Sequence, residues 1–473
     1  MINKYLASQI KLNFPFNATS QQENSLEKIS EFILSGDSRK IFLLCGYAGT
    51  GKTTLISALV KTMEQLGRKT VLLAPTGRAA KVFSSYSGKN AYTIHKWIYR
   101  QKSMLDSSRF TLMENRAVNT LFIVDEASMI SNAGTSNFGS GALLDDLLEF
   151  VYSGEGCSML LLGDTAQLPP VGEELSPALS PRYLQSLFMN VTAVELTQVM
   201  RQLDDSGILF NATKLRDIIC SGETGVVPNI CLEGLPGISR VQGEELVERI
   251  ESSYNEAGHD ETIILCRSNK RANVYNEGIR RRILYREEEL SRGDMLMIVK
   301  NNYYWREQLG RVDKSLLGKL DFIANGDVAE IKRVGGVEEM YGFRFADVTL
   351  SLIDYDDCEI DVKIILDTLV SESPSLTKDE NERLFNAVWE DYPEIKSKRK
   401  RMEQVRSNPY YNALQVKYGY AVTCHKAQGG QWKHVFIDQG YVTPDMMTLD
   451  YYRWLYTAFT RATEQLYLVN WRV

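Results

Sequence analysis

A glycine-rich turn at residues 46–53 is the feature that most constrains how this chain can fold. It reads Gly-Tyr-Ala-Gly-Thr-Gly-Lys-Thr, follows an apolar run and precedes a helical pattern. A buried strand, a tight turn and a helix start in this order point backbone N–H groups at phosphate oxygens, and the helix N-terminus adds positive potential. A chance glycine turn is the alternative, but the strand, the spacing and the Lys-Thr pair together favour a nucleoside-triphosphate site. The residues predicted to line it are Gly46, Gly49, Thr50, Gly51, Lys52, Thr53 and Thr54.

Two side chains of this turn have distinct predicted tasks. Lys52 would reach the β- and γ-phosphates, and Thr53 would offer its hydroxyl to Mg²⁺. The sequence therefore predicts that the chain binds a nucleoside triphosphate, and the open question is how the energy is used.

Length, charge and cysteine content limit the class of protein. With 473 residues the chain is too long for one core, so about two to four domains are expected. Seven scattered cysteines favour neither a zinc site nor a disulfide framework, so we expect a reducing cytoplasm. No apolar run is long enough to span a bilayer. The net charge of −6 argues against coating nucleic acid by bulk electrostatics, so any such contact must be a local track that also uses stacking.

Apolar runs and helical stretches alternate along most of the chain, which predicts an α/β fold with two lobes, each a parallel sheet covered by helices. Residues 100–119 break this alternation and are interpreted as a small inserted hairpin or loop. Residues 290–412 have short β-like runs followed by a charged helical stretch at about 378–406, which we interpret as a β-rich insertion. The predicted strands lie at 41–45, 71–74, 121–124 and 159–162 in the first lobe and at 262–266, 434–438 and 466–470 in the second. The first lobe would comprise 1–99 and 120–205, and the second 206–289 and 413–473.

Two strand ends carry side chains that suit phosphoryl transfer. Asp125 and Glu126 end one apolar strand, where an aspartate can hold a metal and an adjacent glutamate can position or deprotonate water. Gln167 follows the next buried strand and could sense the γ-phosphate, although a tight Gly/Pro turn also explains this segment. Arg201 and Arg461 could reach across a cleft to the transferring phosphoryl group. Each arginine alone would better suit a surface ion pair, and only its occurrence alongside the other motifs favours the catalytic interpretation.

Short blocks occur in a fixed order from about residue 19 to residue 470. They are Thr19-Ser20-Gln21-Gln22, the glycine-rich turn, 73–81 (Leu-Ala-Pro-Thr-Gly-Arg-Ala-Ala-Lys), 93–95 (Thr-Ile-His), 125–126 (Asp-Glu), 163–171 (Gly-Asp-Thr-Ala-Gln-Leu-Pro-Pro-Val), 201–202 (Arg-Gln), 420–429 (Tyr-Ala-Val-Thr-Cys-His-Lys-Ala-Gln-Gly) and 456–462 (Tyr-Thr-Ala-Phe-Thr-Arg-Ala). This ordered set resembles the superfamily 1B DNA helicases, in particular the RecD-like and Dda-like groups. The block at 423–429 is the most specific, and the resemblance covers nearly the whole chain.

The resemblance implies a P-loop fold of two RecA-like lobes and assigns the catalytic roles. Asp125 would bind Mg²⁺ with Thr53, and Glu126 would be the catalytic base. Arg201 and Arg461 would contact the γ-phosphate from the second lobe, and Gln167 would couple that phosphate to motion.

The resemblance also implies the ligands. Gln22 would recognise adenine and so favour ATP, while Gln428 and Gly429 would link ATP to DNA near the cleft. The family moves 5′ to 3′ along the strand, a direction that nothing in the composition or spacing of this chain shows. The residues expected along the single-strand track are Pro75, Thr76, His95, Pro169, Pro170, Thr423 and His425.

The two insertions match parts of the same family. The family's small hairpin wedge corresponds to residues 100–119, where Phe110 is a candidate for the edge that splits the duplex; an ordinary surface loop with a half-buried phenylalanine is the alternative. The family's SH3-like barrel corresponds to residues 290–412. The basic run at 396–401 could follow a phosphate backbone, although a solvated helix face explains it at least as well. For His95, a structural histidine is the alternative to stacking on a base.

The leading hypothesis is a monomeric, ATP-driven DNA helicase that acts on single strands and on single-strand/duplex junctions. A helicase or translocase acting on RNA is a second hypothesis, and a nucleotide-gated clamp that binds single strands without moving is a third. Replication or repair proteins are expected partners, and no membrane contact is expected. The complete catalytic set speaks against the clamp.

Overall fold

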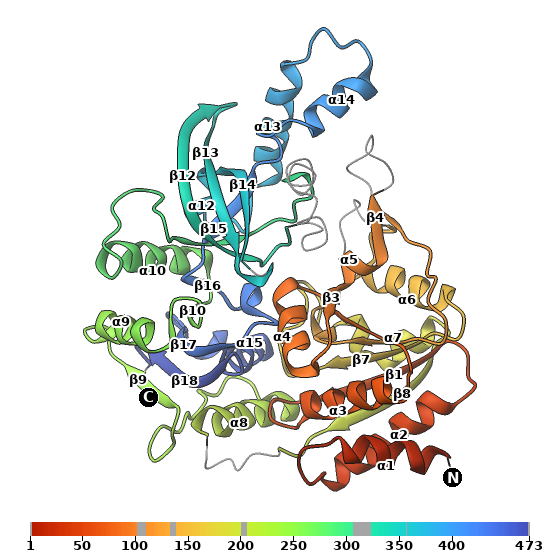
Figure 1. Ribbon diagram of the computed structural model, residues 1–473. Coiled ribbons are helices and arrows are strands. Elements are labelled where there is room, and N and C mark those ends of the chain that lie inside the picture. The colour runs from red at the N-terminus through yellow and green to blue at the C-terminus, as the bar shows by residue number, and fades with distance from the viewer. Residues whose placement is uncertain are drawn as a thin grey trace.

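The first lobe is a six-stranded parallel sheet with helices on both faces (Figure 1). The computed structural model describes residues 2–101, 110–132, 139–199, 206–305, 323–355 and 357–471. The strand order is β3-β2-β6-β7-β1-β8. Every residue of β1, β6 and β7 is buried, because helices cover both faces of these central strands. The bounds are β1 (Lys40–Gly46), β2 (Thr70–Ala74), β3 (Ala91–Thr93), β6 (Leu121–Val124), β7 (Ser158–Gly163) and β8 (Asn190–Leu196).

Several helices of the first lobe begin at side-chain caps. Before α2, the Thr19 hydroxyl accepts a hydrogen bond from the Gln22 N–H while the Gln22 side chain accepts one from the Thr19 N–H, which is a complete capping box. The bounds are α1 (Ile2–Leu12), α2 (Ser20–Leu34), α3 (Lys52–Gln65), α4 (Gly77–Ser87), α5 (Ile94–Ile98), η1 (Ala127–Met129), α6 (Leu143–Ser153), η2 (Pro177–Leu179) and α7 (Pro181–Ser186).

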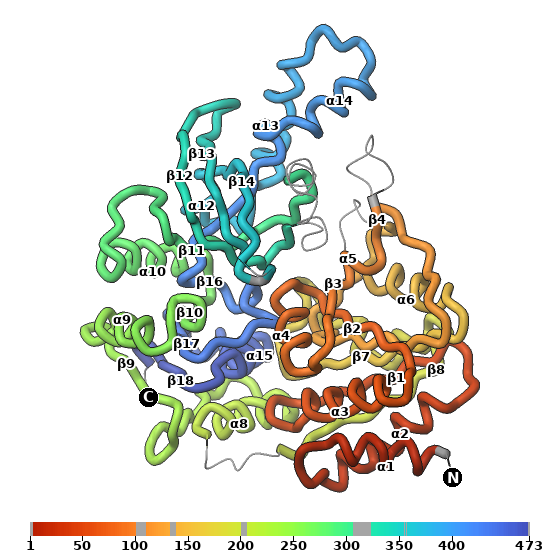
Figure 2. Tube along the Cα trace, in the orientation of Figure 1, coloured from red at the N-terminus to blue at the C-terminus, as the bar shows by residue number. Residues whose placement is uncertain are grey.

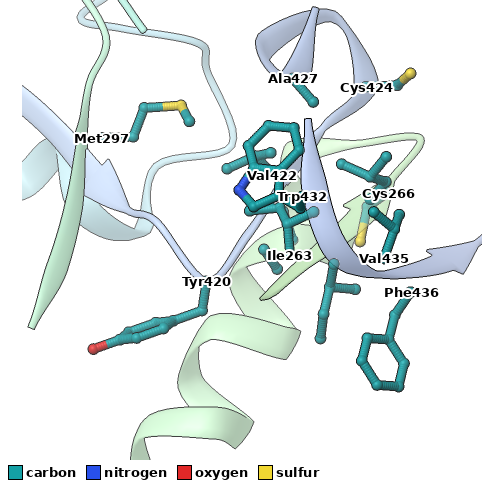
Figure 3. Packing of buried hydrophobic residues seen from close by; sticks show 14 of the residues in the cluster. Ile263, Cys266, Met297, Tyr420, Val422, Cys424, Ala427, Trp432, Val435 and Phe436 are labelled. Atoms are coloured by element: carbon teal, nitrogen blue, oxygen red, sulfur yellow. The ribbon is translucent and has the colours of Figure 1, made fainter. Parts of the chain in front are cut away.

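The second lobe is a five-stranded parallel sheet in the order β16-β10-β17-β18-β9. Figure 3 shows its core, where Val422, Trp432 and Val435 pack together with neighbouring side chains. The strands are β9 (Ile238–Val241), β10 (Thr262–Cys266), β16 (Ala421–Thr423), β17 (Trp432–Asp438) and β18 (Ala462–Val469). The helices are α8 (Gly207–Ser221), α9 (Leu246–Ala257), α10 (Asn269–Arg282), η6 (Cys424–Ala427), η7 (Pro444–Met446) and α15 (Leu449–Phe459). The green and blue parts of the tube in Figure 2, distant in sequence, intermingle in this lobe.

A closed barrel stands beside the second sheet and is inserted into its chain. Its strands are β11 (Met295–Ile298), β12 (Val328–Met340), β13 (Phe343–Leu352), β14 (Cys358–Ile365) and β15 (Leu414–Tyr418). The closing strand, β15, lies beyond residue 412, in the stretch that the sequence assigned to the second lobe. It belongs to the barrel because it pairs with both β11 and β14. Short helical turns, η5 (Ile353–Tyr355) and α12 (Asp367–Val370), flank β14.

A helical arm extends from the barrel before β15. It consists of α13 (Lys378–Glu390) and α14 (Lys398–Arg406) and projects at the top of Figure 1. The sequence predicted a single helical stretch at 378–406. The structure has two helices instead, because Pro393 prevents its neighbour from continuing the helix and Ser397 caps a new one.

A two-stranded antiparallel hairpin lies within the predicted insertion of the first lobe. Strand β4 (Tyr99–Gln101) pairs with β5 (Phe110–Leu112). The hairpin segment between them, 102–109, lies outside the described residues. Among the described residues, no helix is both long and apolar enough to cross a membrane.

Candidate nucleotide and DNA-binding site

The glycine-rich turn joins the buried strand β1 to the N-terminus of α3. Gly49 and Gly51 have φ values of 76° and 83°, in the left-handed region that glycine adopts at little cost. The Thr50 hydroxyl donates to the Tyr47 carbonyl at 2.8 Å and pins the turn from inside. A Cβ atom on Gly46 would lie 3.0 Å from the Leu196 Cβ on the neighbouring strand β8, so this position has no room for a side chain.

Two predicted nucleotide contacts are held by this turn. The Lys52 ammonium donates to the Gly46 carbonyl and, at 3.0 Å, to the Tyr47 carbonyl, so it lies over the turn where phosphate oxygens would replace these carbonyls. The Gln22 amide nitrogen donates to the Thr50 carbonyl at 3.1 Å, and its oxygen is taken by the cap of α2. Both the nitrogen and the oxygen of the Gln22 amide thus bind other groups of the protein, so in this structure the Gln22 side chain stabilises the turn.

The carboxylates follow β6 and face the same turn. The Asp125 carboxylate accepts from the Tyr86 hydroxyl at 2.5 Å and from the Glu126 N–H at 2.8 Å. Desolvation raises the pKa of Asp125, and Lys52 opposes this increase. Desolvation also raises the pKa of Glu126, and the positive charge of Arg461 opposes that increase most. Because Glu126 and Arg461 come from different lobes, the pKa of Glu126 depends on how the lobes meet.

Glu126 itself adopts a left-handed backbone conformation, with a φ of 52°. This is an uncommon conformation for a residue with a side chain, and such strain collects at functional sites. Here it turns the chain sharply between β6 and η1.

The segment after β7 brings Asp164 and Gln167 to the cleft. Asp164 is buried, accepts from the Ala166 N–H at 3.0 Å and accepts from the Tyr456 hydroxyl at 2.7 Å. The Tyr456 hydroxyl also accepts from the Ala48 N–H in the glycine-rich turn, at 2.9 Å. The Gln167 amide oxygen is buried and has no hydrogen-bond partner among the described residues. Such an orphan acceptor is costly unless a ligand or a water satisfies it.

Arg461 reaches the cleft from the end of α15, on the second lobe. It is buried, and its guanidinium donates to the Thr457 and Gly430 carbonyls at 3.1 Å each. Arg201, the other predicted arginine, lies outside the described residues. The Gln428 amide donates to the Leu168 carbonyl of the first lobe at 2.7 Å, and the Thr457 hydroxyl accepts from the Leu168 N–H at 2.8 Å.

Gly429 lies where the second lobe packs against the first. Its φ is 74°, and a Cβ atom there would lie 2.9 Å from the Ala79 Cβ and 3.2 Å from the Thr76 hydroxyl oxygen. A residue predicted to link ATP to DNA therefore contacts a residue predicted to lie on the track.

The predicted track residues of the first lobe follow neighbouring strands. Pro75 and Thr76 follow β2, and His95 follows β3, while the phosphate site lies at the ends of β1, β6 and β7. Carboxyl ends of parallel strands share one edge of the sheet, so the two sets of residues are neighbours. Thr76 caps α4 by accepting from the Ala79 N–H at 3.2 Å. Desolvation lowers the pKa of His95 to about 4, so its ring is neutral at pH 7, and the ring lies 5.7 Å from the ring of Tyr99.

A pocket of about 290 Å³ joins the remaining track residues across the lobes. Its lining includes Pro169 and Pro170 from the first lobe and His425 and Trp454 from the second. Thr423 ends β16, two residues before His425. Desolvation lowers the pKa of His425, and Asp450 opposes this decrease.

Phe110 does not stand alone at an exposed edge. Its ring lies half-buried, 4.2 Å from the ring of Tyr303, which follows the first strand of the barrel. The hairpin is therefore in contact with the insertion of the other lobe.

The structure adds candidate functional residues that the sequence interpretation did not single out. Tyr456 and Thr457 join the lobes at the cleft, and only their place in a block shared with the family could have signalled them. Lys426 is another candidate: its ammonium is buried without a hydrogen-bond partner among the described residues, and it follows His425, a residue predicted to lie on the track. Burial, with Lys417 nearby, lowers the pKa of Lys426 to about 7.

The donor set suits a magnesium ion that shares its ligands with a substrate. No group of three or more His, Cys, Asp or Glu side chains in the described ranges could hold a metal alone. Thr53 and Asp125 supply a hydroxyl and a carboxylate, the hard oxygen donors that Mg²⁺ takes, and Mg²⁺ commonly completes its shell with substrate phosphates and water. The buried, partnerless oxygen of Gln167 is an acceptor, so it fits a water that donates a hydrogen bond in the same cleft.

Comparison with known proteins gives two family matches along the chain. Residues 19–217 match a family described as an AAA domain, and residues 418–469 match one described as a UvrD-like helicase C-terminal domain. The first contains the glycine-rich turn, the carboxylates and Gln167; the second contains Gln428, Tyr456 and Arg461.

Three curated relatives show how far the similarity extends. An uncharacterised protein of Acanthamoeba polyphaga mimivirus is 24% identical over 94% of this chain and 98% of its own length. The ATP-dependent DNA helicase dda of enterobacteria phage T4 is 24% identical over 83% of this chain and 86% of its own. The ATP-dependent RecD2 DNA helicase of Deinococcus radiodurans is 34% identical over 36% of this chain, which corresponds to 21% of that protein.

Among solved structures, a Bacteroides Pif1 helicase in complex with ADP-AlF3 and ssDNA aligns over 97% of this chain and 93% of its own. The sequence identity is 16% and the TM-score 0.46. Taken together, the two family matches and the helicase relatives support a superfamily 1B DNA helicase that hydrolyses ATP.

Proposed function

We propose that the chain is an ATP-dependent motor that moves along single-stranded DNA, 5′ to 3′, and separates duplex DNA at junctions. One observation carries this proposal. Helix α15 of the second lobe places Tyr456 on the glycine-rich turn and Arg461 within electrostatic reach of Glu126, so the nucleotide site is divided between two lobes. A site of this kind changes the relation between the lobes when its γ-phosphate is lost.

The chain's own residues supply the proposed chemistry. Lys52 and the backbone N–H groups of the turn bind phosphate oxygens, and Glu126 orients the attacking water and accepts its proton. Arg461 stabilises the charge that develops on the transferred group. When bound, Mg²⁺ would be held by Thr53 and Asp125 and would neutralise phosphate charge. Arg201 is proposed as a second γ-phosphate contact.

Contacts between the two predicted sets of residues suggest how hydrolysis is coupled to movement. Gln428 binds the backbone beside Gln167, and Gly429 packs on Thr76. A change in the cleft would therefore reach the track within a few residues. Base-pair stacking is worth about 1.4 kcal/mol per step, so a small motion suffices to capture one opened pair at the hairpin. We further propose a monomer that acts in the cytoplasm with replication or repair proteins.

Unwinding of tailed duplexes tests this proposal. Duplexes with a 5′ tail, a 3′ tail or blunt ends are incubated with ATP and Mg²⁺, and strand displacement is followed. We expect displacement of the 5′-tailed duplex alone, and none with a non-hydrolysable ATP analogue. Displacement from the 3′ tail would reverse the direction inferred from the family resemblance.

Two results would point to the alternative functions. Stimulation of ATP hydrolysis by RNA rather than by DNA of matched sequence would indicate an RNA-directed motor. ATP-dependent binding of single strands with no displacement from any duplex would indicate a clamp.

A further inference from the structure

The helical arm α13–α14 carries a strongly basic surface that the motor described above does not use. Residues 396–406 contain six cationic side chains and one acidic one, in a chain whose net charge is −6. Lys396, Lys398 and Lys400 are exposed, and no ion pair is recorded for them in the described part of the chain. Helix α13, in contrast, begins with Asp379 and Glu380.

Hydrogen bonds and packing hold helix α14 of the arm in place. The Arg401 guanidinium donates to the Trp389 carbonyl at 2.9 and 2.6 Å and lies 4.5 Å from the centre of the Trp389 ring. Val405 is buried with Leu384 and Val388 in the small core at the base of the arm. Because α14 is oriented by Arg401 and Val405, its free lysines stand on the outer surface and would need little ordering to bind a ligand.

The base of the arm is connected to the strand-separating hairpin. The segment after β11 contacts both: Tyr303 packs on Phe110 of the hairpin, and the Trp305 indole donates to the Asn412 carbonyl at 2.9 Å, just after the arm. The Lys300 ammonium donates to the Asn381 side chain of α13 at 3.1 Å. The hairpin and the arm therefore both contact the segment after β11, and they lie on the same side of the molecule (Figure 1).

We propose that the basic surface of the arm, Lys396, Lys398 and Lys400, binds the phosphate backbone of duplex nucleic acid next to the hairpin. This inference rests on the proposed function in one respect, which is that the duplex lies next to the hairpin. Clustered lysines on an exposed helix bind phosphates as point charges and release counterions, so this contact would favour no base sequence. It would hold the duplex while the hairpin separates the strands.

Salt dependence of binding gives a sharp test. The triple variant Lys396→Ala, Lys398→Ala, Lys400→Ala is compared with wild type for binding to a forked duplex and to its single-stranded tail alone, without nucleotide. Loss of three phosphate contacts should lower the slope of log K against log salt by about 2.7 for the fork. When salt is raised from about 50 to 200 mM, the affinity of wild type should fall by a factor about 40 times larger than the factor for the variant. The single-stranded tail should show no such change.

The matched control is Lys4→Ala, Lys61→Ala, Lys69→Ala, which removes the same charge from exposed positions on the first lobe. Equal effects of the two triple variants, or an effect on the tail as large as on the fork, would overturn the proposal and leave a solvated helix or an acidic protein partner as the explanation. Lys398→Glu with Lys400→Glu should weaken fork binding further, and unchanged thermal melting of each variant shows that the arm is folded.

Stimulation of ATP hydrolysis by single strands is measured alongside. If that activity is absent while the fork-specific slope still changes, the proposed motor fails and the duplex-binding surface stands.

Discussion

The nucleotide cleft and the hairpin side of the molecule are assembled in different ways. In the cleft, Lys52, Asp125 and Asp164 each follow a buried strand by a few residues, and the second lobe supplies the groups that reach across, Gln428, Tyr456 and Arg461. On the hairpin side, Phe110 meets Tyr303 from a separate insertion. The comparison teaches that the sheets position the candidate catalytic groups, whereas the proposed strand separation would depend on how two insertions pack together.

Removing Arg461 should have the largest effect and would test the part of the cleft that comes from the second lobe. Arg461→Ala should lower kcat for ATP hydrolysis by about 10³–10⁵-fold, because the charge on the transferred group loses its partner. Loss of this cation should also raise the pKa of Glu126 further, which moves the acidic limb of the kcat/KM profile to higher pH because the base acts when deprotonated. Arg461→Lys should keep much of the pH profile while losing rate.

The control for Arg461 is Arg453→Ala. Arg453 lies on the same helix and donates to the Glu174 carbonyl of the first lobe at 2.6 Å, so its loss removes a contact between lobes but no charge recorded near Glu126. An equal fall in kcat for both variants would mean that Arg461 only holds the lobes together.

Lys52→Ala tests whether chemistry and DNA binding are separable. ATP hydrolysis should fall by at least about 10²–10³-fold, since a preorganised cation at the phosphates is lost. Binding of single-stranded DNA should stay within about twofold, because the predicted track lies at the ends of other strands. Lys61→Ala, on the exposed face of the same helix, is the control. A folded Lys52→Ala protein that binds no DNA would show that the two sites are one.

Phe110→Ala removes the aromatic contact between the hairpin and the barrel insertion. We expect slower strand displacement with unchanged ATP hydrolysis on single strands, because the ring anchors the hairpin to Tyr303. A cycle with Tyr303→Ala should show a coupling of about 0.5–1.5 kcal/mol in stability, as for other aromatic pairs. Tyr5→Ala, an exposed aromatic on α1, is the control. Equal losses of displacement and hydrolysis would argue against a separate wedge.

The smallest expected effect concerns pH and Lys426, next to the predicted track. Burial lowers the pKa of its ammonium to about 7, and a DNA phosphate would favour the protonated form. Single-strand affinity should therefore fall by about tenfold between about pH 6 and 8, measured by titration with a labelled oligonucleotide. The Lys426→Met variant should lose this dependence. A pH profile that is the same in both proteins would place Lys426 away from the phosphates.

Particular residues show how much of the fold the sequence predicted. The apolar runs at 121–124 and 262–266 became β6 and β10 with the same bounds, because a strand buried on both faces is continuously apolar. Strand β8 was missed because it mixes exposed and buried residues at the sheet edge, and β16 because it is only three residues long. The helix break at Pro393 was readable and overlooked, whereas the pairing of β15 with β14 and β11 has no local signal.

The sequence by itself determined the phosphate turn, the carboxylates after β6 and the family of the chain, because these depend on residue types at short, fixed spacing. Only the tertiary structure decided that Tyr456 binds the turn, that Arg461 acts on Glu126, and that Phe110 and the arm both contact the segment after β11. Those contacts join segments far apart along the chain. Packing of whole elements, which no local pattern encodes, brings them together.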